Sequence, residues 1–319
     1  MAVLGIDLGA TKISYALFDD LGTFLYRGKK MLDRADLHSA EDLLLNMVTE
    51  MLAKGDKLRS PVKAIGICVP GIAYKDTGMV WAPNIQGWDN FPLVAHLRKK
   101  IIKTDIPIEI ESDRGCHLLG EYWCGIARDK TDAIYLAVGT GIGAGIMCQG
   151  ELLRGVGDIS GAIGWMALKP PYHHKYDACG CFEYHASGDG LTRVARELMA
   201  GGEVSDHLAQ LRDIRAENIF AAWEKGDVVA VKTIDQAVEM WGMAAANLVS
   251  LFNPQLLIFG GGVFGPGKKL IDRIYEEARK WAQPISINQV EFKASVLEGD
   301  AGLIGAGYLA LNKLTSNRI

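Results

Sequence analysis

The sequence lacks the features that would carry a protein across or into a membrane. No run of about 18 apolar residues occurs, so no membrane-spanning helix is expected. The opening residues, MAVLGIDLGATKIS, lack the cationic segment, the apolar stretch and the small-residue cleavage site of a secretory signal. We therefore expect a cytoplasmic protein with no membrane partner.

An excess of positive charge is also missing. The 34 Lys and Arg residues are outnumbered by 38 Asp and Glu residues, which gives a formal charge of -4. Surfaces that bind nucleic acid are typically basic, so no nucleic-acid partner is expected. The six cysteines are scattered, mostly within apolar stretches, as buried thiols of a reducing compartment would be.

What is present is a repeated pattern of strands and glycine turns. Residues 2–30 and residues 132–155 both read as strand, glycine turn, strand, turn, strand. The repeat predicts two halves of similar topology. Elsewhere strands alternate with helical segments, which predicts an α/β protein whose ligands lie beyond the carboxyl ends of the strands.

Three glycine-rich segments are candidates for phosphate or nucleotide binding. They are Asp7-Leu8-Gly9-Ala10-Thr11-Lys12, GTGIGAG at 139–145 and Gly260-Gly261-Gly262. Small residues let backbone N–H groups approach phosphate oxygens, and a carboxylate such as Asp7 can hold Mg²⁺ through water. Each segment taken alone is equally compatible with an ordinary tight turn.

Asp113 follows the predicted strand IPIEIES and precedes a predicted helix. A carboxylate fixed at such a strand end can accept the proton of a substrate hydroxyl as that oxygen attacks phosphorus. A helix-capping acid is the alternative that the spacing leaves open.

Seven segments together resemble, in order, the signature segments of the ROK family of sugar kinases and related repressors. They are DLGATK, GICVPG, APNIQGW, IEIESD, VGTGIGAGI, IFGGG and DAGLIGAG, and the resemblance runs from residue 3 to about 311. The resemblance implies a duplicated ribonuclease-H-like (actin-like) fold of two domains, with ATP and sugar meeting in the interdomain cleft. We expect a small domain at 1–113 plus a C-terminal helix at 301–319, and a large domain at 114–300.

The resemblance also implies roles for individual residues. The nucleotide and its Mg²⁺ would be bound by Asp7, Gly9, Thr11, Lys12, Thr140, Gly141, Gly143, Gly260, Gly261 and Gly262. Asp113 matches the catalytic aspartate. Gly71 and Asn84 fall in loops that border the sugar site, and Glu183 matches an acid that contacts a sugar hydroxyl. A homodimer is implied as well.

The sugar end departs from the family pattern. Ser112 stands where the family has Asn, and Ala162 and Trp165 stand where it has the Glu and His of Gly-Glu-x-Gly-His. Replacing polar contacts by a methyl and an indole predicts weaker binding of ordinary glucose and a bulkier, deoxygenated or differently substituted substrate. Loss of function is the alternative.

The replacement of the family histidine by Trp165 also removes a predicted zinc ligand. Family members commonly bind structural zinc with that histidine and three cysteines, whereas only Cys179-Gly180-Cys181 remains here. A closed site needs four ligands. The histidines near enough in sequence to substitute are His173, His174 and His185. Solvent-exposed histidines are the alternative interpretation, and we expect no metal bound by the protein alone.

Three functions are compared. The first is an ATP- and Mg²⁺-dependent kinase that phosphorylates a hydroxyl of a sugar-like small molecule, with Asp113 as general base. The second is a sensor that binds sugar or nucleotide without turnover, against which we note that no DNA-binding segment precedes the fold. The third, an NAD-dependent oxidoreductase suggested by GTGIGAG, is disfavoured because the following IMCQGELLRG alternates like a strand rather than a helix.

Overall fold

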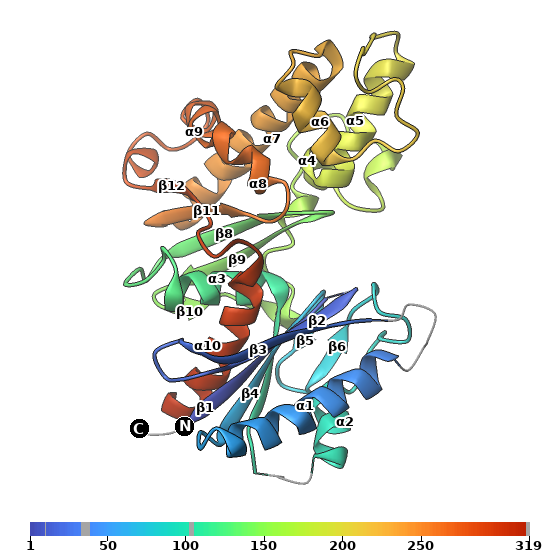
Figure 1. The fold of residues 1–319 in the computed structure, drawn as a ribbon. Helices are drawn as coiled ribbons and strands as arrows, with labels where there is room; N and C mark the ends of the chain where they lie inside the picture. Colours follow the sequence, from blue (N-terminus) through green and yellow to red (C-terminus); the bar gives the residue numbers. More distant parts are fainter. Residues whose placement is uncertain (10, 33–38, 102–104, 317–319) are drawn as a thin grey trace. The chain divides into compact units, whose positions relative to one another are not determined.

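The computed structural model describes residues 1–9, 11–32, 39–101 and 105–316 (Figure 1). The chain divides into two compact units that are not contiguous in sequence. Unit 1 comprises Met1–Asp129, Arg154–Ser160 and Gly299–Ile319, and unit 2 comprises Lys130–Leu153 and Gly161–Glu298.

Unit 1 contains a five-stranded mixed sheet in the order β3-β2-β1-β4-β7. Its strands are β1 (Ala2–Leu8), β2 (Lys12–Phe18), β3 (Phe24–Met31), β4 (Val62–Val69) and β7 (Ile108–Ser112). The first three form an antiparallel meander, whereas β4 is parallel to both β1 and β7. The carboxyl ends of β1, β4 and β7 therefore lie at one edge of the sheet.

The helices of unit 1 cover both faces of this sheet. They are α1 (Ser39–Lys57), α2 (Leu93–Lys100), α3 (Asp113–Cys124) and α10 (Ala301–Ser316), and a small hairpin joins β5 (Ile72–Tyr74) to β6 (Met79–Trp81). Even-numbered residues of β1, such as Leu4 and Ile6, share a core with Met47 and Met51 of α1. The odd-numbered Gly5 faces α10, as expected from the two-residue period of a strand.

Glycines allow α10 to pack closely on its neighbours. A Cβ at Gly305 would collide with the carbonyl oxygen of Cys116 in α3, and one at Gly66 of β4 would collide with that of Ala306. Because α3 packs on α10, it belongs to unit 1, and the first boundary between the units follows Asp129 rather than the expected Asp113. Residues 317–319 of the expected C-terminal helix lie outside the described residues.

Unit 2 repeats the topology of unit 1. Its sheet has the order β10-β9-β8-β11-β12 and consists of β8 (Ala133–Val138), β9 (Ile142–Cys148), β10 (Glu151–Leu152), β11 (Leu256–Gly260) and β12 (Glu291–Ala294). Again three antiparallel strands are followed by two parallel ones. The predicted α/β class and duplicated fold are therefore confirmed.

The helices of unit 2 surround the long central α7. They are α4 (Cys181–Ala186), α5 (Gly188–Ala200), α6 (Ala216–Trp223), α7 (Val228–Phe252), α8 (Phe264–Gly267) and α9 (Ile271–Ala278). Trp241 of α7 is fully buried and donates its indole N–H to the carbonyl oxygen of Ala186 at 3.0 Å. Within the described ranges no helix is both long enough and apolar enough to span a bilayer.

Candidate active site

Two carboxylates of unit 1 lie at the edge where the parallel strands end. Asp7 is near the end of β1, beside Cys68 of β4, and Asp113 is the first residue of α3, directly after β7. Burial raises the pKa of Asp7, while His117 and a hydrogen bond from Cys68 oppose this shift and the charge of Asp113 adds to it. The two carboxylates are therefore close enough to interact electrostatically.

Asp113 occupies the positive end of α3. The side-chain oxygen Oδ1 accepts a hydrogen bond from the backbone N–H of Arg114 at 2.8 Å, and the carboxylate is half-buried. An anion at a helix N-terminus is stabilised by the helix dipole and by the free N–H groups of the first turn. The position at the start of a helix also fixes the carboxylate on rigid structure, as a general base requires.

Ser112 caps α3 instead of offering its hydroxyl to solvent. Its Oγ accepts from the backbone N–H of Gly115 at 3.3 Å and donates to Glu111 Oε1 at 3.1 Å, and the residue is 6% exposed. Ser112 was expected to contact substrate. Its hydroxyl is directed to the helix cap, and its local sequence, a serine directly before a helical pattern, is also typical of an N-cap.

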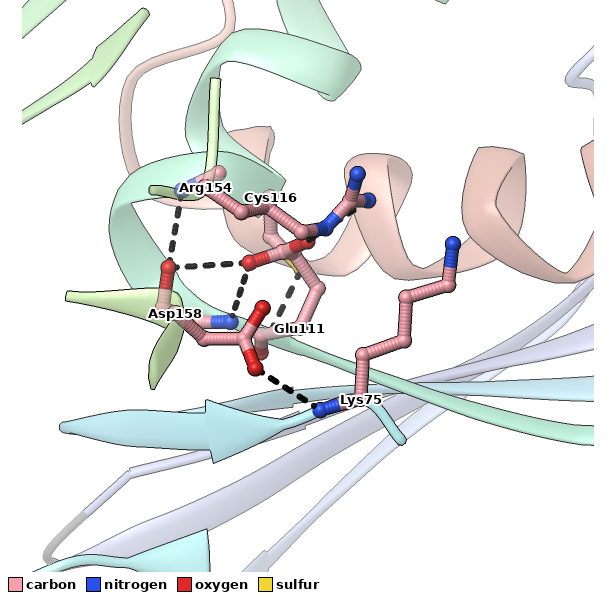
Figure 2. A network of polar contacts seen from close by, with 7 residues as sticks. Lys75, Glu111, Cys116, Arg154 and Asp158 are labelled. Atoms are coloured by element: carbon pink, nitrogen blue, oxygen red, sulfur yellow. Dashed lines mark hydrogen bonds and ion pairs between the residues drawn. The ribbon is translucent and has the colours of Figure 1, made fainter. Parts of the chain in front are cut away.

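Glu111 and Arg154 form a partly buried ion pair beside the Ser112 cap (Figure 2). Glu111 Oε2 accepts from Arg154 Nε at 3.0 Å and lies 2.9 Å from Arg154 Nη2. No local pattern predicts their pairing, because the two residues are brought together only by the fold.

The hairpin between β1 and β2 is tight. The N–H of Gly9 donates to the carbonyl oxygen of Lys12 at 2.9 Å, and the side chains of Thr11 and Lys12 are exposed. Gly71 lies in a loop predicted to border the sugar site. Its φ is 129°, and a Cβ there would collide with the carbonyl oxygen of Trp81, so only glycine fits. Asn84 is exposed.

A cavity of about 720 Å³ in unit 2 brings together two of the predicted nucleotide segments. Thr140 lines it from the β8–β9 turn and Gly262 from the turn after β11. The charged residues of the lining, none of them predicted, are Asp189, Arg193, Arg196, Asp213, Arg215 and Glu217. They come from α5, from α6 and from the residues just before α6, none of which was among the predicted nucleotide segments.

The other predicted glycines of unit 2 have structural roles beside this cavity. A Cβ at Gly260 would collide with Tyr135, and Gly261 has a φ of 87° against the backbone of Val138. Gly143 is a buried residue of β9. The strand that follows GTGIG is the one predicted, so the helix that a dinucleotide fingerprint requires is replaced by β9.

The side chain of Glu183 is hydrogen-bonded to the turn between β8 and β9. Its Oε2 accepts from the backbone N–H of Ile142 at 2.7 Å, and a Cβ at Gly141 would fall 2.7 Å from the same oxygen. Burial raises the pKa of Glu183, opposed by the Ile142 hydrogen bond and by the charge of Arg193. Nearby, Ala162 is half-buried and the indole of Trp165 is 58% exposed.

The histidine and cysteine segment does not form a metal cluster. Among residues 1–9, 11–32, 39–101 and 105–316, no three His, Cys, Asp or Glu side chains are grouped as ligands would be. His185 Nε2 is paired with the Tyr176 hydroxyl at 3.0 Å, and His174 Nδ1 lies 3.5 Å from Asp177. Burial, with smaller contributions from Lys169 and Lys175, lowers the pKa of His185 to about 4.

Known proteins resemble this chain along nearly its whole length. A glucokinase of Halalkalibacterium halodurans is 30% identical over 96% of this chain and 94% of its own. A ROK family transcriptional regulator, described as a homologue of the E. coli MLC protein, superposes with a TM-score of 0.84 at 25% identity, over 97% of this chain and 77% of its own. A ROK family glucokinase from Streptomyces griseus, solved with glucose and AMPPNP, gives 0.74 at 28% identity, over 98% of this chain and all of its own.

A family model agrees with these individual matches. The ROK family model matches residues 3–313, the range over which the seven signature segments are spread. Both the repeated strand order and the carboxylates at the strand ends fall within it. The chain belongs to the ROK family.

Proposed function

We propose that the protein is a kinase that transfers the γ-phosphoryl group of ATP to a hydroxyl of a sugar or sugar-like substrate. The observation that carries the proposal is the pair of carboxylates at the strand ends of unit 1, Asp7 and Asp113. It is supported by the glucokinase relatives and by the glucose and AMPPNP complex of the Streptomyces griseus protein.

Asp113 is proposed as the general base. As the substrate hydroxyl attacks the γ-phosphorus, its proton moves to the Asp113 carboxylate and the bond to the ADP oxygen breaks. Attack by a hydroxyl is difficult at neutral pH, and a positioned base contributes about 10²- to 10⁴-fold to the rate. The Ile142 N–H donates to Oε2 of Glu183, and the other oxygen, Oε1, is proposed to accept a hydrogen bond from a substrate hydroxyl.

Asp7 suits a cation that accompanies ATP. Burial and the neighbouring Asp113 both disfavour the ionised form of Asp7, and a nearby Mg²⁺ would restore it. Asp7 would hold the ion, directly or through water. When bound, Mg²⁺ would supply charge neutralisation of the phosphates.

The nucleotide is proposed to enter the cavity lined by Thr140 and Gly262. Its volume of about 720 Å³ is in the range of ligand pockets, about 300–1,000 Å³. The turn of Thr140 and Gly141, which leads from β8 to β9 at this cavity, would donate backbone N–H groups to the phosphates.

The test is a kinase assay with ATP, Mg²⁺ and a panel of sugars and cyclitols, in which product is identified by mass spectrometry. We expect one substrate class to be phosphorylated and Asp113→Asn to lower kcat by about 10²- to 10⁴-fold with little change in KM. Asp300→Asn, which removes an exposed ion pair with Arg27, is the control. Full activity of Asp113→Asn would refute the assignment.

A sensor without turnover is the second candidate, favoured by the match to the transcriptional regulator and by Ala162 and Trp165. In that case nucleotide and sugar would raise the unfolding temperature of the protein, yet no phosphorylated product would form. Formation of product excludes this candidate.

A further inference from the structure

The carboxylate of Glu111 is shared between two partners that lie on opposite sides of it. One oxygen, Oε1, accepts from the backbone N–H of Ser112 at 2.9 Å and from the Ser112 hydroxyl at 3.1 Å. The other oxygen, Oε2, accepts from Arg154. Each oxygen thus has a different partner, so the same carboxylate links Arg154 to Ser112.

Arg154 comes from a short segment that belongs to unit 1 although unit 2 precedes and follows it in the sequence. The segment, Arg154–Ser160, is closed on itself by a backbone hydrogen bond and is joined through Asp158 to Lys75, the residue after β5. Asp158 Oδ2 accepts from the backbone N–H of Lys75 at 3.1 Å (Figure 2). The Ser160 N–H donates to the carbonyl oxygen of Arg154 at 2.9 Å. The guanidinium is therefore presented from a constrained backbone.

The pair is buried enough for its geometry to matter. The side chain of Glu111 is 8% exposed and that of Arg154 is 25% exposed. The first turn of α3 rests directly on the carboxylate, since a Cβ at Gly115 would fall 2.8 Å from Glu111 Cδ. Removing one partner would leave a buried charge uncompensated, which is costly, so the pair holds its arrangement tightly.

We propose that Glu111 and Arg154 are positioning residues for Asp113: the ion pair fixes the Ser112 cap, and through it the direction in which the Asp113 carboxylate points. Neither residue is proposed to touch substrate. The kinetic part of this inference rests on the proposed kinase function, whereas the effect on the turn does not. A misplacement of about 1 Å at a reacting group can cost about 10²-fold in rate, so a loosened cap should be visible in kcat.

The variants Glu111→Gln, Arg154→Met and Arg154→Lys test the proposal in the full-length protein. Glu109→Gln is the matched control, because Glu109 lies on the same strand, is 15% exposed in its side chain and pairs with Lys313 at 2.8 Å, away from the cap. Two readouts are measured: hydrogen exchange of the Ser112 and Gly115 amides, and the kinetics of phosphoryl transfer.

We expect Glu111→Gln and Arg154→Met to speed exchange of both amides by about tenfold or more, because both amides donate to the cap network. In the kinase assay kcat should fall by about tenfold or more while KM for ATP stays within about twofold, since the proposed nucleotide pocket is built by unit 2. Arg154→Lys keeps the charge but not the paired donors, and should recover part of kcat.

The proposal is overturned if the two amides exchange as in wild type, or if kcat falls no further than in Glu109→Gln. If Glu111→Gln does not fold, Arg154→Lys carries the same comparison. A wild-type protein that phosphorylates nothing in the panel would refute the proposed kinase function instead. Amide exchange would then decide by itself whether the pair fixes the turn.

Discussion

Replacing Gly5 by alanine tests the close packing of α10 on the sheet of unit 1. A Cβ at Gly5 would lie 2.8 Å from the backbone nitrogen of Gly307 and 2.8 Å from the carbonyl oxygen of Leu303. Both are helix backbone atoms, which cannot rotate away as a side chain would. To restore an ordinary contact of 3.4 Å, α10 and β1 must separate locally by about 0.6 Å.

The expected cost follows from two opposing effects. Overpacking of this kind costs about 1–3 kcal/mol, and the lower conformational freedom of unfolded alanine recovers about 0.5–1 kcal/mol. The net destabilisation of unit 1 should be about 1–2 kcal/mol, which corresponds to a fall in unfolding temperature of about 5 °C for a domain of this size. Because Asp7 lies two residues farther along β1, the proposed kinase activity should fall as well.

Scanning calorimetry of Gly5→Ala, with Gly299→Ala as the control, measures this effect. A Cβ at Gly299 would meet nothing within 4 Å, so that variant should unfold as wild type does. The reasoning is refuted if Gly5→Ala unfolds at or above the wild-type temperature, or if both variants are destabilised equally.

Three further predictions concern unit 2. Glu183→Gln should leave the protein as stable or more stable at neutral pH, because burial disfavours the ionised carboxylate, and should lower sugar phosphorylation by about tenfold or more; a clear loss of stability in calorimetry would contradict this. The pKa of His185 is about 4 in the folded protein against an ordinary value of 6.5, so its contribution to the free energy of unfolding is complete above pH 6.5. That contribution is lost as the pH falls towards 4, by on the order of 3 kcal/mol. Urea unfolding of His185→Gln should therefore depend less on pH over this range than unfolding of the wild type. Gly262→Val should raise KM for ATP by about tenfold without lowering the unfolding temperature, since a Cβ at Gly262 meets nothing within 4 Å and points to free space at the cavity; an unchanged KM would refute the proposed pocket.

Local patterns predicted the parts of the fold that depend on near neighbours in sequence. The two meanders follow from alternating apolar residues and glycine turns, and their repetition was enough to predict two similar halves. Thr140 and Gly262 lie in separate turns, and the structure brings both to one cavity. That meeting depends on β8 and β11 being adjacent parallel strands, which the α/β alternation allows but does not specify.

The parts of the candidate site that the sequence did not predict depend on contacts between segments that are distant in the chain. Glu111 pairs with Arg154, which is 43 residues away, and no local pattern indicates that the two residues meet. The arginines of the cavity lie in or near amphipathic helices, where a charged side chain is ordinary unless the fold directs it into a pocket. Ser112 has a role that its place directly before a helical pattern could have indicated: it caps α3, while the predicted substrate contact stays a prediction.

The close packing of α10 also has a consequence for biosynthesis. Gly5 and Gly66 belong to strands made early, yet the helix that covers them is made after the entire unit 2. During translation the face of the unit 1 sheet that α10 covers therefore stays exposed until residues 301–316 have been made. The N-terminal strands are thus the part of the nascent chain that we expect to need protection by a chaperone, even though they are the first to leave the ribosome.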